Sequence, residues 1–91
     1  MTDHLLIEAL DRLEAGDWDE AHRIVQDFDG TGAAWLHAHL HRVEGDAENA
    51  RHWYGKANMA PFEGDVTEER YALRQELTSG TTDAMGQPPQ E

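Results

Sequence analysis

A repeated pattern built around two glycine–aspartate corners is the feature of this sequence that most constrains its fold. The segment 13–25 aligns with the segment 42–54 at a constant offset of 29 positions. The matched residues are of the same kind in both copies: Gly16 with Gly45, Asp17 with Asp46, Asp19 with Glu48, Ala21 with Ala50, and Ile24 and Val25 with Trp53 and Tyr54. A period of about 20 to 50 residues is typical of stacked supersecondary units. We therefore expect two copies of one structural unit.

Each copy has the pattern of a helical hairpin. Apolar residues before and after each corner recur at the spacing of an amphipathic helix. The glycine can take the left-handed conformation that ends a helix, and the aspartate after it can accept the free N–H groups that begin the next one. Asp17 and Glu20 also have the spacing of a capping box. Because the connection is so short, the two helices are expected to lie antiparallel and side by side.

The expected elements follow from these patterns. Helices are predicted over 3–15, 18–28, 32–44 and 47–58, with a loop over 58–64 in which Pro61 removes a backbone donor. A fifth helix is predicted from Asp65 to about Leu77, with an apolar stripe that consists of Val66, Arg70 or Tyr71, Leu73 and Leu77. The composition after residue 78 predicts a disordered tail over 79–91, behind a single domain over 1–78.

The predicted fold is all-α, with two stacked antiparallel helical hairpins and a C-terminal capping helix. Two units are fewer than the roughly three that a repeat array usually needs to cover its end faces. The apolar end of such an array is covered by the fifth helix, by a second copy of the chain or by a partner. We therefore expect self-association, with a homodimer as its form.

The second copy extends into a longer series of small, aromatic and turn residues: Trp35, Gly45, Asp46, Ala50, Trp53, Tyr54, Ala57 and Pro61. This series resembles one unit of the tetratricopeptide or Sel1-like repeats, and the resemblance covers residues 3–61 as two units with a repeat shorter than is usual in that family. The run 35–46 also resembles a group of small bacterial proteins of unassigned function. The resemblance implies a scaffold that binds partners on a concave face and is seldom an enzyme.

The composition limits the classes of partner that the chain is expected to bind and indicates where in the cell it is expected to lie. The 19 acidic residues outnumber the 7 basic ones, and the net charge of -12 disfavours nucleic acid and anionic membranes. Dense surface charge suits a salt-rich cytoplasm, in which screening is strong. The chain has no cysteine, which excludes disulfides and thiolate chemistry. It shows neither a membrane-spanning run nor an apolar leader, and we expect a cytoplasmic location.

Three of the six histidines stand close together in the predicted third helix. Successive residues of a helix are about 100° apart, and for this reason His37 and His41 share one face while His39 points to nearly the opposite side. Glu44 lies one turn further along the face of His37 and His41. Two imidazoles and a carboxylate could bind zinc or nickel, with water or His22 completing the site.

The same histidines have a structural interpretation, in which they are spacers between helices and bond to nearby carbonyls or carboxylates. For His39 we expect packing beside Trp35, with its ring nitrogens satisfied by a neighbouring helix. Neither interpretation is excluded by the spacing, because a pair of histidines one turn apart is a weak motif.

Aromatic and basic side chains form a second candidate site, for partner binding, which consists of Trp18, Trp35, Arg42, Trp53 and Tyr54. Trp35, Trp53 and Tyr54 are expected to meet where the third and fourth helices pack, and Trp18 is expected to be half exposed. Such side chains serve equally as core or as rigid contact area for a partner. Arg42 is expected to pair with Glu44 and Asp46 around the turn, or alternatively to grip a carboxylate ligand.

The leading functional hypothesis is a noncatalytic interaction module, whose groove between helices 1, 3 and 5 receives a peptide or protein segment. The acidic field would steer a basic partner toward it. The rival hypothesis is a small metal-binding protein built on His37 and His41, and a third is an accessory subunit without a discrete site. Catalysis is not expected, because the only serine is Ser79 and most carboxylates fall on polar helix faces.

Overall fold

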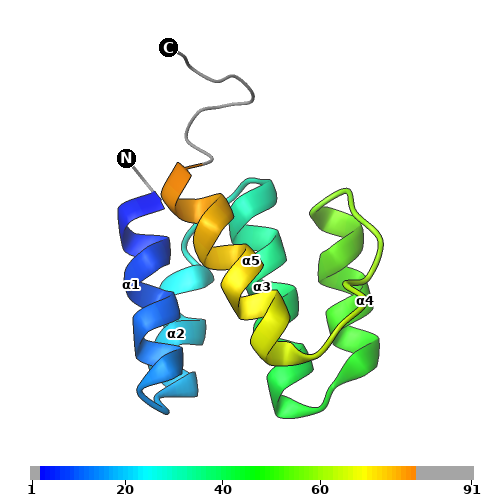
Figure 1. Cartoon of the computed structure of the whole chain (residues 1–91), viewed down its shortest axis with the longest axis horizontal. Coiled ribbons are helices and arrows are strands. Elements are labelled where there is room, and N and C mark those ends of the chain that lie inside the picture. The colour runs from blue at the N-terminus through cyan, green and yellow to red at the C-terminus, as the bar shows by residue number, and fades with distance from the viewer. Residues whose placement is uncertain (1–2, 80–91) are drawn as a thin grey trace.

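The computed structural model describes residues 3–79, and within them the chain forms five α-helices and no strand. The helices are α1 (Asp3–Glu14), α2 (Trp18–Val25), α3 (Thr31–Glu44), α4 (Ala47–Lys56) and α5 (Val66–Ser79), as Figure 1 shows. The all-α prediction is confirmed. The predicted tail over 79–91 lies outside the described residues, except for Ser79, with which α5 ends.

The observed helices differ from the predicted ones mainly at their C-terminal ends. α2 ends at Val25 and α4 at Lys56, a few residues before the predicted ends. Asn58, just after α4, takes a positive φ of 63°, a conformation that a helix cannot contain. The stretch after α2 is rich in aspartate and glycine, which favour turns over helix.

Both glycine–aspartate corners form as predicted. Gly16 and Gly45 have φ values of 91° and 92°, in the left-handed region that ends a helix. The side chain of Asp17 accepts a hydrogen bond from the Glu20 N–H at 3.2 Å, which caps α2. The capping box at this corner is incomplete, because the Glu20 carboxylate pairs with Arg23 and does not accept a hydrogen bond from the Asp17 N–H.

The equivalent cap at the second corner is made by Asp46, which accepts from the Asn49 N–H at 3.1 Å and begins α4. A complete capping box begins α5. There the Asp65 N–H donates to the Glu68 carboxylate at 3.0 Å, and the Glu68 N–H donates to the Asp65 carboxylate at 2.8 Å. All three helix starts therefore follow from short-range pairs that the sequence displays.

α5 lies across α1 and α3 and joins the two hairpins on one side of the molecule (Figure 1). Its leucines, Leu73 and Leu77, are buried in the main apolar core together with residues of α1, α2 and α3. These side chains fill the space between α1, α3 and α5, where the sequence predicts a peptide groove. Arg74 pins the same helix to α1 through Asp11 at 2.8 Å.

The predicted apolar stripe of α5 is wrong at one turn. Tyr71 is 69% exposed, and the residue of this turn that faces the interior is Glu69, whose side chain is fully buried. Glu69 lies one helical turn before Leu73, which places it on the same face as the buried leucines. A carboxylate therefore occupies the position for which an aromatic or arginine side chain was predicted.

α3 is the central helix and contacts each of the other four. One of its faces joins the main core through Leu36 and Leu40. Another packs on α4 through a smaller cluster that contains Ala38, Ala50 and Tyr54. Within residues 3–79 no helix is both long and apolar enough to cross a lipid bilayer.

Candidate metal centre

The histidines of α3 are all removed from solvent. His37 is 7% exposed, His39 is fully buried and His41 is 6% exposed. As the helical spacing predicts, His37 and His41 share one face of α3 and His39 lies on the other side; the first face meets α2 and the second meets α5. The helix therefore carries two separate polar sites, one on each face.

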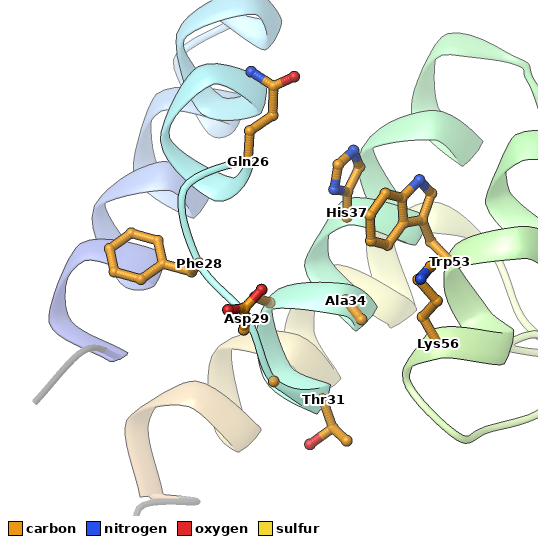
Figure 2. A pocket seen from close by; sticks show the side chains of 10 residues that line it. Gln26, Phe28, Asp29, Thr31, Ala34, His37, Trp53 and Lys56 are labelled. Atoms are coloured by element: carbon orange, nitrogen blue, oxygen red, sulfur yellow. The ribbon is translucent and has the colours of Figure 1, made fainter.

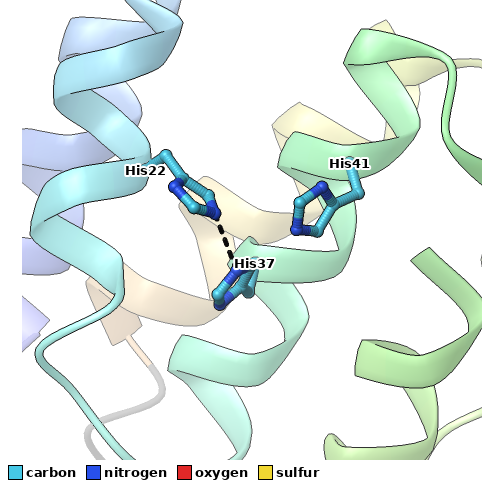
Figure 3. Close-up of side chains that lie close together, drawn as sticks. All are labelled: His22, His37 and His41. Carbon is cyan, nitrogen blue, oxygen red and sulfur yellow. Dashed lines mark hydrogen bonds between the residues drawn. The ribbon is translucent and has the colours of Figure 1, made fainter. Parts of the chain in front are cut away.

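The first site is the histidine trio, which consists of His22 from α2 and of His37 and His41 from α3. Figure 3 shows the three imidazoles turned toward one another. His22 Nε2 and His37 Nε2 are hydrogen-bonded at 3.0 Å, and one ring nitrogen of each histidine lies within 4.8 Å of the others. In a tetrahedral zinc site the Zn–N bonds of about 2.0 Å place neighbouring nitrogens about 3.3 Å apart. The nitrogens of the trio therefore lie within about 1.5 Å of the spacing that such a site requires.

Burial favours the uncharged form of two histidines of the trio, His37 and His22. It lowers the pKa of His37 from 6.5 to about 4, an effect that the neighbouring His22 and His41 reinforce. Burial likewise lowers the pKa of His22, again with a contribution from His41. At neutral pH both rings therefore carry a free lone pair, which is the form that binds a metal.

Two indole rings hold the trio in place. Trp18 stacks on His22 with ring centroids 4.7 Å apart, and Trp53 stacks on His37 at 3.8 Å. Trp18 is itself fixed, because its Nε1–H donates to the Leu40 carbonyl at 2.7 Å. These contacts restrict the orientation of the imidazoles before any ion is present, which reduces the entropy that binding would cost.

Glu44, a predicted ligand, lies behind His41 and outside the group formed by the three imidazoles. Its carboxylate accepts a hydrogen bond from His41 Nδ1 at 2.7 Å, whereas His22 brings a ring nitrogen within 4.8 Å of those of His37 and His41. In the neutral ring this bond leaves the lone pair of His41 on Nε2. A carboxylate behind a histidine orients the ring and raises its basicity in many metal sites. The donor atoms of His41, Glu44 and Asp46 also lie within 4.8 Å of one another, with both carboxylates exposed.

The second site, on the opposite face of α3, is the Glu69 network. The buried carboxylate of Glu69 accepts hydrogen bonds from Trp35 Nε1 at 2.9 Å, His39 Nδ1 at 2.8 Å, Arg42 Nη1 at 3.0 Å and the Tyr54 hydroxyl. Burial alone would raise the pKa of Glu69, but the hydrogen bonds outweigh it and lower that pKa to about 2. The network therefore holds an anion inside the fold at neutral pH.

The tautomer of His39 follows from its partners. Arg70 Nε donates to His39 Nε2 at 3.2 Å, which places the ring proton on Nδ1, where it is donated to Glu69. Both ring nitrogens are thus satisfied by a neighbouring helix, as predicted, and that helix is α5. His39 has no lone pair to offer an ion.

Three of the residues predicted to bind a partner belong to the Glu69 network: Trp35, Arg42 and Tyr54. The predicted pairing of Arg42 with Glu44 and Asp46 is wrong, because its guanidinium reaches α5 and also donates to the Gly64 carbonyl. The long arginine side chain finds a buried carboxylate there, where the ion pair is stronger than at the exposed turn. The other two predicted residues, Trp18 and Trp53, frame the histidine trio.

No protein-family model, curated protein or solved structure matches this chain. The chemistry of the trio therefore rests on its own donor atoms. Three imidazoles on two packed helices resemble the donor set of zinc sites with three protein ligands, in which a fourth position is left for water or another ligand. The same set suits nickel and copper, since imidazole binds all of these ions.

Proposed function

We propose that this chain is a small metal-binding protein in which His22, His37 and His41 bind one divalent ion of the zinc or nickel type. The observation that supports the proposal best is the convergence of three imidazoles from two helices, with donor atoms within 4.8 Å. The Trp18 and Trp53 stacks and the Glu44 carboxylate behind His41 add the outer shell that such sites usually have.

Hydrogen bonds satisfy only some of the ring nitrogens of the trio. One proton links His22 to His37, and among residues 3–79 His41 Nε2 has no hydrogen-bond partner. Buried polar atoms are normally satisfied, so that three imidazoles sharing so few bonds form a costly arrangement. An ion at their centre would use all three lone pairs at once. The net charge of -12 would favour the approach of a cation.

The test is a titration of the untagged, EDTA-treated full chain with Zn²⁺ and with Ni²⁺ by calorimetry. We expect one ion per chain, together with a change in tryptophan fluorescence because two indoles stack on the ligands. At a free ion concentration of about 100 times Kd, binding would stabilise the fold by about 2.7 kcal/mol.

Variants identify the ligands. His22→Gln and His41→Gln should each weaken binding strongly, and the matched control His52→Gln should not, because His52 is exposed on α4 outside the trio. Absence of stoichiometric binding to the wild-type chain would overturn the proposal, as would equal binding by the trio variants and the control.

A second candidate function is the interaction module predicted from the repeat, and the tetratricopeptide resemblance stays a prediction. It is supported by the acidic charge and by the large apolar side chains Leu5 and Tyr71, which are 43% and 69% exposed. Light scattering at high micromolar concentration tests the predicted homodimer. Association with a basic peptide, measured at two ionic strengths, tests the partner, because electrostatic steering weakens as salt rises.

A further inference from the structure

A pocket of about 520 Å³ adjoins the histidine trio, and His37 and Trp53 form part of its wall (Figure 2). It lies between the connection that follows α2, the first half of α3, and α4. Its volume falls within the range of about 300 to 1,000 Å³ that is usual for sites that bind small molecules. The pocket is therefore large enough for a ligand of its own.

Two charged side chains of opposite sign line this pocket. Asp29 comes from the connection between α2 and α3, and Lys56 comes from α4, and Figure 2 shows them on opposite sides. Neither forms an ion pair within residues 3–79, with each other or with a third residue. By contrast, Arg12, Arg23 and Arg74 are each paired with a carboxylate.

Lys56 is the only lysine of the chain. Its ammonium group lies 5.7 Å from the centre of the Trp53 ring, at the border of the pocket. The Trp53 ring and the Ala34 methyl group supply an apolar surface between the two charges (Figure 2). A ligand for this pocket therefore meets a cation, an anion and an apolar wall.

We propose that the pocket binds a small zwitterion of the α-amino-acid class. The carboxylate of the ligand pairs with Lys56, its ammonium group pairs with Asp29, and its side chain lies against Trp53 and Ala34. A simple anion would be repelled by Asp29 and by the net charge of -12, and a simple cation would be repelled by Lys56. A molecule that carries both charges can pair with Lys56 and with Asp29 at the same time. This inference goes beyond the metal site and does not require an ion in the trio.

The experiment compares three ligands with the same phenylethyl skeleton on the metal-free full chain. L-phenylalanine carries both charges, 2-phenylethylamine lacks the carboxylate, and 3-phenylpropionate lacks the ammonium group. Binding is followed by tryptophan fluorescence and by NMR shifts of the Gly30 and Ala34 amides, which belong to residues of the pocket wall. We expect L-phenylalanine to bind at least about tenfold more tightly than either analogue, because each analogue loses one charged hydrogen bond.

Variants then assign the two ends of the ligand. Lys56→Gln should abolish the preference for L-phenylalanine over 2-phenylethylamine, and Asp29→Asn should abolish the preference over 3-phenylpropionate. The matched controls are Arg51→Gln, which removes another exposed cation of α4, and Asp27→Asn, which removes an exposed acid near Asp29. The proposal is overturned if L-phenylalanine produces no shift at millimolar concentration, if an analogue binds equally well, or if the controls change the preference as much.

Discussion

The Glu69 carboxylate of α5 accepts a hydrogen bond from His39 Nδ1 of α3 at 2.8 Å, and both side chains are fully buried. This bond joins the last described helix to the central one. The other donors to Glu69 come from α3 and α4, so that one carboxylate holds three helices together. A buried anion of this kind is stable only while its donors remain in place.

Glu69→Gln should therefore destabilise the fold by about 2 to 3 kcal/mol, since the amide accepts fewer hydrogen bonds and leaves Arg42 without its counter-charge. Urea unfolding followed by circular dichroism measures the effect. The control is Glu76→Gln on the same helix, where the side chain is exposed and a change within about 0.5 kcal/mol is expected. Equal stability of the two variants would contradict the structural role of the Glu69 network.

Acid should remove the stabilisation that the ionised Glu69 carboxylate gives to the fold. The folded pKa of Glu69 is about 2, below the ordinary value of 4.5, so that the unfolded state takes up its proton first as the pH falls. The stabilisation is complete above pH 4.5 and is lost progressively between pH 4.5 and 2. Urea midpoints measured across this window should fall more steeply for the wild type than for Glu69→Gln. Parallel curves would show that Glu69 does not carry the acid sensitivity.

His37 should make the stability of the fold depend on pH in a higher pH range than Glu69 does. Its folded pKa of about 4 lies below the ordinary 6.5, and the unfolded chain therefore binds the proton more readily between these values. Stability from the neutral His37 is complete above pH 6.5 and declines as the pH falls toward 4. NMR titration of the imidazole, in the metal-free chain, measures this pKa directly. A midpoint near 6.5 would mean that the ring is more accessible to water than the structure shows.

The two corner glycines and the helical Gly55 should respond to alanine in opposite directions. Gly45 has a φ of 92°, and Gly45→Ala should cost about 1 kcal/mol of stability from backbone strain, although nothing lies within 4 Å of the new methyl group. Gly55 lies inside α4 with open space around it, and Gly55→Ala should stabilise by about 0.5 to 1 kcal/mol. Thermal unfolding of both variants decides the point, and a gain in the Gly45 variant would contradict the left-handed corner.

The corners and the α3 histidines show how much could be predicted from the sequence. Gly45, Asp46 and the shared face of His37 and His41 depend on neighbours within one or two turns, and such short-range relations can be read from residue order. The meeting of His22 with the other two was available only as one option, because the spacing does not tell which face of α2 turns toward α3.

The Glu69 network could not be predicted, because it depends on how α5 returns across the hairpins after the 58–64 loop. One signal was present: Glu69 falls on the stripe of Leu73 and Leu77, at the place of an apolar residue. A charged residue on a buried stripe needs partners, but the sequence does not name them. Arg42 was accordingly assigned to its nearest acidic neighbours, and the distant carboxylate was missed.

Glu44→Gln tests the outer shell of the proposed metal site. The Glu44 carboxylate accepts from His41 Nδ1 at 2.7 Å, and an amide holds the ring less firmly and lowers its basicity. Affinity for Zn²⁺ should fall by about 10- to 100-fold, as is usual when such a partner is changed, while one ion still binds per chain. Glu63→Gln is the control, because it removes an exposed charge from the loop before α5, outside both polar sites. Calorimetry separates the outcomes: a loss of stoichiometry would make Glu44 a ligand, and affinities equal to those of the control would remove it from the site.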